Sequence, residues 1–305
     1  MLKEELTGLS QRFEERKLVD RAKGVLMRSH GLTEDEAFEL LRNLAMRSRQ
    51  RLGVVAQSVI DMSRAGEAVN RGGQLRMLSQ RIVKCYAQVL VGLEAEAALQ
   101  IMSDCVVRGK SNLGILRKAI GAKGDGELVD RVAASWQGVL LLCAEPPEAQ
   151  QLDLLDARAD AMLKDAERLT EFLEASGLVA SLHVLNVAGR QRMLSQRITK
   201  LCFMLALEPS GARLTQLREL AATFQIALDY LCNVPLSSVA IRENLQTGLV
   251  EWRRLHATLD AIGDANAIAQ VSDASERLLD VSERLTDQYE QAMQVLIGDR
   301  IGRMG

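Results

Sequence analysis

Two segments of nearly identical sequence carry the residues best suited to binding chemistry. Residues 70–84 read NRGGQLRMLSQRIVK, and residues 186–200 read NVAGRQRMLSQRITK. Both contain RMLSQRI with its two arginines, and a guanidinium group binds small planar oxyanions through forked hydrogen bonds. The segments therefore indicate an anion site, in which each charged hydrogen bond would contribute ~1.5–3 kcal/mol.

Helical spacing predicts which of these arginines meet. On a helix, Asn70, Gln74, Met77 and Arg81 share one stripe, which Asn186, Arg190, Met193 and Arg197 repeat in the second segment. If the two stripes face each other across a pseudo-two-fold axis, Arg81 and Arg197 converge, and an anion between them removes their repulsion. The alternative is that these arginines only tie helices together through Asp or Glu partners.

Four other arginines are secondary candidates for the anion. Arg76 and Arg192 project roughly 160° away from the stripe on ideal helix geometry. The remaining pair breaks the symmetry, because Arg71 is matched by Val187 and Arg190 by Gln74. Small residues at Gly72, Gly73 and Gly189 are consistent either with a close helix approach or with a backbone donor.

The two segments lie 116 residues apart, and this offset also relates much of the remaining chain. It superposes Trp136 on Trp252, the only two tryptophans, and Glu167 to Thr170 on Glu283 to Thr286. Helical periodicity and short Gly- or Pro-containing connections predict two up-and-down four-helix bundles in an all-α chain. The expected helices run roughly from Val54 to Val91, Glu94 to Ile120, Glu127 to Ala144, Glu148 to Ala175, Leu178 to Leu207, Gly211 to Cys232, Ser237 to Ala261 and Asn266 to Leu296.

Composition narrows the class of protein. The 305 residues include 48% hydrophobic but only 3% aromatic side chains, which favours packed helices over β-sandwiches. The net charge of −2 gives no overall basic field for nucleic acid. The first residues lack the apolar core of a signal peptide, and no run approaches the ~20 apolar residues of a spanning helix. A cytoplasmic protein without membrane contact is expected.

Catalytic and metal chemistry find no support in the sequence. The five cysteines form no CxxC pair, and the three histidines lack a His or Cys at metal-ligand spacing. Reduced, buried thiols are expected. No Gly-rich phosphate loop or nucleophile–base pair is recognisable, so we expect neither an enzyme nor a bound cofactor or metal.

Residues 1–60 lie outside the repeat and hold a local group of cations. Three helices are expected, the first ending near Arg28, the second capped by Thr33 with Glu36 as a capping box, and the third starting near Ser48. A short coiled-coil-like seam contains Leu2, Leu6, Leu9 and Phe13. The cations that could bind phosphates, or could simply form a solvated charged face, are Arg21, Lys23, Arg28, Arg47, Arg49 and Arg51.

The N-terminal sixty residues resemble the ANTAR domain. The similarity rests on the AKGVLM segment beginning at Ala22, on GLTEDEAF beginning at Gly31, and on a third helix that ends in VAQSVI at Ile60. It implies an RNA-binding module that dimerises and stabilises paired stem–loops, so that transcription passes a terminator. ANTAR domains usually follow a sensor or receiver domain, whereas the ANTAR-like segment comes first in this chain.

Both NxxGxxRMLSQR segments resemble the sensor domain of type IV pili chemotaxis transducers, the PilJ family, and the P-box of nitrate-sensing histidine kinases and antiterminators. This resemblance covers about residues 61–300 as two copies and implies that nitrate or nitrite binds near a two-fold axis between paired first helices.

We therefore expect a nitrate- or nitrite-responsive transcription antiterminator, which acts as a homodimer on leader RNA. Its predicted domains are 1–60 (ANTAR), 61–177 and 178–305 (the two sensor repeats). A mostly continuous helix from about Arg49 to Val91 would join effector and sensor. The alternative is a non-enzymatic adaptor whose bundles bind a partner protein.

Overall fold

The computed structural model describes residues 2–120, 126–175, 180–235, 238–262 and 264–301. Within these residues the chain forms ten α-helices and two short 3-10 helices and contains no strand, which confirms the all-α prediction. Two compact units are present, one made of Met1–Glu67 with Glu290–Gly305 and the other of Ala68–Tyr289. The predicted domain limits at 60 and 177 stay predictions, and the second falls outside the described residues.

The first unit is built on three helices. α1 (Leu2–His30) packs against α2 (Glu34–Ser48), and both pack against the start of α3 (Leu52–Leu90). The capping box is confirmed, because the Thr33 side chain accepts from the Glu36 N–H while the Glu36 carboxylate accepts from the Thr33 N–H at 2.8 Å. The core contains Leu26, Leu41 and Val55, all fully buried.

The third helix begins later than the sequence indicated. α2 ends at Ser48 because Arg49 takes up the left-handed conformation, with φ of 52°. A residue with this backbone terminates a helix, so α3 starts at Leu52 instead of near Ser48. From there it runs to Leu90 without a break, which confirms the continuous helix expected between the N-terminal helices and the first arginine segment.

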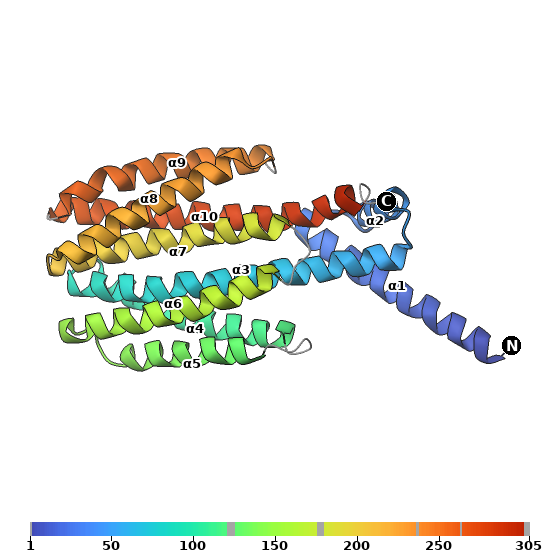
Figure 1. Cartoon of the computed structure of the whole chain (residues 1–305), viewed down its shortest axis with the longest axis horizontal. Helices are drawn as coiled ribbons and strands as arrows, with labels where there is room; N and C mark the ends of the chain where they lie inside the picture. The colour runs from blue at the N-terminus through green and yellow to red at the C-terminus, as the bar shows by residue number, and fades with distance from the viewer. Residues whose placement is uncertain (1, 121–125, 176–179, 236–237, 263, 302–305) are drawn as a thin grey trace. The chain divides into compact units, whose positions relative to one another are not determined.

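The second unit contains two sets of four helices in the order predicted from the repeat. After α3, the helices are α4 (Ala95–Ile120), α5 (Gly126–Leu142), α6 (Leu152–Ala175), α7 (Ala180–Leu207), α8 (Gly211–Asn233), α9 (Val239–Thr258) and α10 (Ala265–Ile301). Figure 1 shows the helices of this unit lying alongside one another, and contacts join α4 to α5, α5 to α6, α6 to α7, α7 to α8 and α8 to α9. The predicted helix starts at Leu178 and Ser237 lie outside the described residues.

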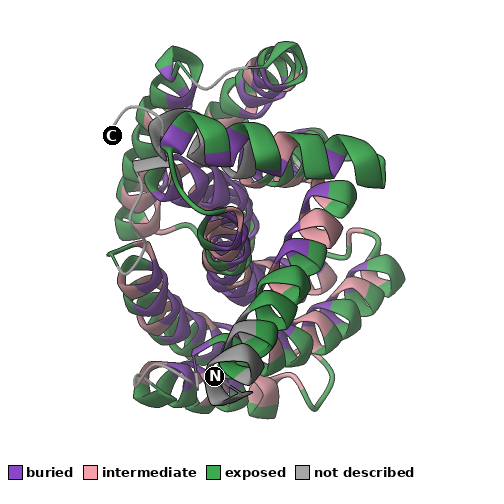
Figure 2. Cartoon of the chain, turned by 90° about the vertical axis from the view of Figure 1, so that its right-hand side faces the viewer, coloured by how far each residue is buried: buried purple, intermediate pink, exposed green. Residues whose placement is uncertain are grey.

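In the second unit α4, α5, α8 and α9 each bury one strip, which faces the other helices in Figure 2, whereas α3 and α7 are buried at nearly every position of 72–88 and 191–204. The equivalent tryptophans Trp136 and Trp252 are both buried, but their surroundings differ. Trp252 stacks on Phe224 with ring centroids 4.2 Å apart, whereas the Trp136 ring covers Gly109 of α4. No helix in the described part of the chain is long and apolar enough to span a membrane.

Gly109 and Gly114 lie on the same helix and provide a matched test of this packing. A Cβ at residue 109 would come within 2.6 Å of Trp136 Cε2, whereas a Cβ at residue 114 meets nothing within 4 Å. We expect Gly109→Ala to lower the free energy of unfolding by about 1–3 kcal/mol through overpacking. Gly114→Ala should raise it by roughly 0.5–1 kcal/mol, because alanine favours the helix. Chemical denaturation measures both, and equal effects would contradict the packing described.

Candidate anion-binding site

Two arginines are buried where α3 passes α7. Arg76 is 0% and Arg192 is 1% exposed. The helices approach closely at their glycines, since a Cβ on Gly73 would lie 4.0 Å from the Cα atom of Gly189. The same Cβ would lie 3.2 Å from Nη2 of both arginines. The two guanidinium groups therefore lie against one glycine, and a larger residue there would displace them.

Reciprocal hydrogen bonds hold the two arginines in place. Arg76 Nη2 donates to Asn186 Oδ1 at 2.6 Å, and Arg192 Nη2 donates to Asn70 Oδ1 at 2.9 Å. The offset of 116 residues relates these two bonds to each other. Each repeat thus inserts an arginine beside an asparagine of the other repeat, as expected of a site on a pseudo-two-fold axis.

The carboxylates around the pair break this symmetry. Arg76 Nη1 donates to Glu167 Oε2 at 2.5 Å, and Arg190 also bonds Glu167. The equivalent carboxylate, Glu283, is bonded instead by Arg108 of α4 at 2.7 Å. Arg192 therefore has no direct bond to a carboxylate in the described structure, and its Nε and Nη1 are buried without a hydrogen-bond partner, as is the Nε atom of Arg76.

Burial opposes the charge of both arginines. Removal from water lowers the pKa of Arg192 to about 10, with the charge on Glu283 opposing the shift and that on Arg76 adding to it. Burial also lowers the pKa of Arg76, against the opposing effect of Glu167. A buried cation with unpartnered N–H groups is costly unless an anion accepts from it. The site is thus electrostatically suited to a small anion between the two helices.

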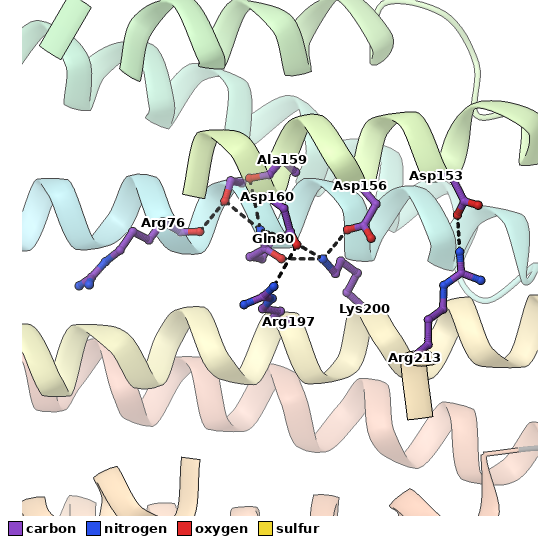
Figure 3. A network of polar contacts seen from close by, with 10 residues as sticks. Arg76, Gln80, Asp153, Asp156, Ala159, Asp160, Arg197, Lys200 and Arg213 are labelled. Carbon is purple, nitrogen blue, oxygen red and sulfur yellow. Dashed lines mark hydrogen bonds and ion pairs between the residues drawn. The ribbon is translucent and has the colours of Figure 1, made fainter. Parts of the chain in front are cut away.

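The arginines favoured by helical spacing each form an ion pair with a carboxylate. Arg81 Nη2 bonds Glu276 Oε2 at 2.6 Å. Figure 3 shows the other pair, in which Arg197 Nη2 bonds Asp160 Oδ2 at 2.9 Å. The 116-residue offset relates these ion pairs too, and each joins the first helix of one repeat to the last helix of the other. Their geometry corresponds to the alternative of arginines that tie helices together.

The last two arginine candidates lie beside the buried pair. Arg190 shares Glu167 with Arg76, as described above. Arg71 Nη1 donates to Gln74 Oε1 at 3.5 Å and to Asn112 Oδ1 of α4 at 3.4 Å. Helical spacing assigned no role to Glu167 or Glu283 in the site. The signal was present in the sequence, because both begin the same repeated ERLT motif.

The candidate phosphate-binding cations of the first unit differ in how far they are exposed. Lys23 bonds Asp20 at 2.8 Å and Glu34 at 2.7 Å. Hydrogen bonds from these two carboxylates raise its pKa. The side chains of the other five, Arg21, Arg28, Arg47, Arg49 and Arg51, are exposed.

The expected coiled-coil seam is exposed where its side chains are described. Leu9 and Phe13 are 70% and 59% exposed, while the side chains of Leu2 and Leu6 lie outside the described residues. The homodimer stays a prediction.

The cysteines only partly follow the expectation of buried thiols. Cys85, Cys105 and Cys202 are buried, but Cys143 is half-buried and Cys232 is exposed. Cys232 lies near the end of α8, where the helix surface meets solvent. The described residues contain no group of three or more His, Cys, Asp or Glu side chains that could hold a metal ion.

Comparison with known proteins assigns families to two parts of the chain. Residues 7–60 match the ANTAR domain, and residues 176–278 match the family described as "Type IV pili methyl-accepting chemotaxis transducer N-term". The chain thus carries an ANTAR domain at its N-terminus and a PilJ-type helical domain in its second repeat. No solved structure matches the chain.

Two curated relatives are regulators. The transcriptional regulatory protein PdtaR of Mycobacterium tuberculosis is 45% identical over 60 residues, which is 20% of this chain and 29% of PdtaR. The nitrate regulatory protein of Klebsiella oxytoca is 39% identical over 56 residues, which is 18% of this chain and 14% of that protein. The chain therefore spans less than a third of the length of either relative.

The ion pairs of Arg81 and Arg197 predict an acid-sensitive fold. Burial opposes ionisation of Asp160 and Glu276, but the neighbouring Lys and Arg side chains lower the pKa of both carboxyl groups. Their stabilisation is therefore complete above the unfolded pKa of about 4 and is lost as the pH falls through the lower folded pKa. At about pH 7 the melting temperature of Asp160→Asn should be lower than that of the wild type. As the pH is lowered to about 3, the melting temperature of the variant should fall less steeply than that of the wild type.

Asp130 is the control for this experiment, because its pair with Arg117 is exposed on both sides. Asp130→Asn should follow the wild-type curve, since exposed pairs contribute little. If Asp160→Asn also follows the wild type at every pH, the ion pair does not stabilise the bundle.

Proposed function

We propose that the protein is a nitrate- or nitrite-responsive transcription antiterminator. In this proposal the ANTAR domain at residues 7–60 binds leader RNA with paired stem–loops, and the helical repeats sense the anion. The ANTAR match and the two regulatory relatives, one of them a nitrate regulatory protein, support the effector half. Neither family points to catalysis, so we assign the chain a regulatory and not an enzymatic role.

One observation carries the sensor half of the proposal, namely the pair of buried guanidinium groups at Arg76 and Arg192. Nitrate is planar, carries one negative charge, and accepts hydrogen bonds at three oxygens, so it can accept from both arginines at once. Arg192 is the side chain whose charge lacks a carboxylate bond, which favours a monovalent anion. We assign Arg71 and Arg190 to the margin of the site, and Arg81 and Arg197 to the support of the helices.

Both repeats are needed to build this site. The PilJ match covers residues 176–278, and the 116-residue offset extends the same pattern to the first repeat. We therefore propose that 61–177 and 178–305 are two copies of one sensor module. Each copy supplies one arginine and one asparagine, so neither copy would form the complete site alone.

Replacement of Arg192 tests the sensor. We expect sodium nitrate to raise the melting temperature of the wild type relative to sodium gluconate at equal ionic strength, because bound ligand stabilises the folded form. Arg192→Gln should bind nitrate roughly ten- to a hundredfold more weakly, since it loses ~1.5–3 kcal/mol of charged hydrogen bonding. Without nitrate, this variant should melt no lower than wild type, because it removes a buried charge that has no carboxylate partner. Calorimetric titration measures the affinity.

Arg197→Gln is the matched control. It breaks the ion pair with Asp160, so its melting temperature in gluconate should fall, but its nitrate shift should persist. The opposite result, with the shift lost in Arg197→Gln and kept in Arg192→Gln, would move the anion site to the stripe of Arg81 and Arg197.

Arg49 gives the cleanest test of RNA binding. Its left-handed backbone, with φ of 52°, suits glycine better than arginine. Arg49→Gly should therefore leave the fold at least as stable while it removes a phosphate contact. In gel shifts with a synthetic RNA of two consecutive stem–loops, we expect weaker binding and a salt slope reduced by about one. Lys23→Ala should also weaken binding, but it removes two ion pairs as well.

Arg12 is an exposed residue of α1, and Arg12→Ala should bind the RNA like wild type. If the wild type itself does not bind this RNA at low salt, the adaptor alternative replaces the antiterminator. If Arg49→Gly binds as tightly as Arg12→Ala, the RNA contacts lie on another face of the ANTAR domain.

A further inference from the structure

Two polar clusters related by the repeat lie beside the candidate anion site. The Lys200 cluster consists of Lys200, Arg197, Gln80, Asp156 and Asp160. The offset of 116 residues maps it onto the Lys84 cluster, which consists of Lys84, Arg81, Gln196, Ser272 and Glu276. Their cations lie one to two helical turns beyond the buried arginines, since eight residues separate Arg76 from Lys84, a rise of about 12 Å.

The Lys200 cluster is balanced in charge. Lys200 Nζ bonds Asp156, donates to Gln80 Oε1 at 2.7 Å and lies 3.4 Å from Asp160 Oδ1 (Figure 3). Arg197 shares Asp160. Two cations thus face two carboxylates, and the three donors of the ammonium group have three acceptors.

The Lys84 cluster lacks one of these carboxylates, because Ser272 occupies the position equivalent to Asp156. Lys84 Nζ bonds Glu276 Oε1, and Arg81 bonds the other oxygen of the same carboxylate. Gln196 donates to Ser275 Oγ at 3.0 Å. Among the described residues, two cations therefore share one carboxylate, although the Lys84 side chain is only 1% exposed.

Two further observations indicate that the cluster lacks a negative charge, although the neutral acceptor Gln196 Oε1 is also buried without a partner. Arg81 Nη1 is buried without a hydrogen-bond partner. The neighbouring thiols do not supply the missing negative charge, since burial raises the pKa of Cys105 to about 12 and also raises that of Cys85. The deficit is a single charge, and in the equivalent cluster one Asp carboxylate fills the same position.

We propose that the Lys84 cluster is a second anion site, which takes a small monovalent anion of the size of chloride in the position of the missing carboxylate. Lys84 Nζ, Arg81 Nη1 and the Ser272 hydroxyl are its donors. One carboxylate is missing, so a divalent anion would leave an excess of negative charge. The site is distinct from the one between Arg76 and Arg192 and does not depend on the proposed function.

Exchanging the residues that distinguish the two clusters tests this site. All variants carry Arg192→Gln so that the first site does not respond, and bromide in a gluconate buffer is the probe. Bromide should raise the melting temperature of the parent. Ser272→Asp supplies the carboxylate in the chain, so it should melt higher than the parent in gluconate and bind bromide at least roughly tenfold more weakly. Asp156→Ser should melt lower in gluconate and gain bromide response.

Ser272→Asn is the control for a change in size without a change in charge, and it should keep the bromide response. Crystals of the parent protein, with Arg192→Gln as its one substitution, should show an anomalous peak beside Lys84 when they are soaked in bromide. Crystals that also carry Ser272→Asp should lack this peak. An equal bromide response in the parent and in Ser272→Asp, or no peak beside Lys84, would overturn the proposal. Neither outcome affects the proposed nitrate site, because the nitrate experiment replaces Arg192 and leaves Ser272 unchanged.

Discussion

The close passage of α3 past α7 at Gly73 and Gly189 is the constraint on which the second unit depends. Two guanidinium groups are buried against this crossing, and like charges in a poorly polar interior repel unless acceptors surround them. The reciprocal bonds to Asn70 and Asn186 supply neutral acceptors from the opposite repeat. Since each bond joins both repeats, these two acceptors reach the arginines only while the two four-helix sets stay together.

One substitution between the repeats explains why the site is not symmetric. Arg108 draws Glu283 away from Arg192, whereas its equivalent in the second repeat is Phe224, which stacks on Trp252 and cannot bind a carboxylate. Glu167 therefore stays with Arg76. The two repeats thus hold equivalent arginines, and the difference at a position outside the RMLSQRI segments leaves Arg192 with a charge that no carboxylate directly bonds.

The sequence predicted the helices more completely than it predicted the contacts of the arginines. Periodicity, the Thr33 capping box and the repeat located the helices to within a few residues, because these signals are local. The choice between Arg76 and Arg81 is not local. Helical spacing shows which residues share a stripe, but the stripe that meets α7 is decided by packing, here by the glycines that let the backbones approach. The acids that pair with Arg81 and Arg197 belong to helices distant in sequence.

α3 is one continuous helix that contributes Val55 to the core of the first unit and Arg76 to the candidate anion site of the second. An anion at Arg76 can change RNA binding only if it binds two conformations of this helix with different affinity, and each factor of ten in that ratio is worth about 1.4 kcal/mol. Arg76 is well suited to such a difference. Its carboxylate partner Glu167 would compete with a bound anion for the same guanidinium group, so anion binding would oppose the bond from α3 to α6. The signal would therefore be a weakening of the contact between Arg76 of α3 and Glu167 of α6.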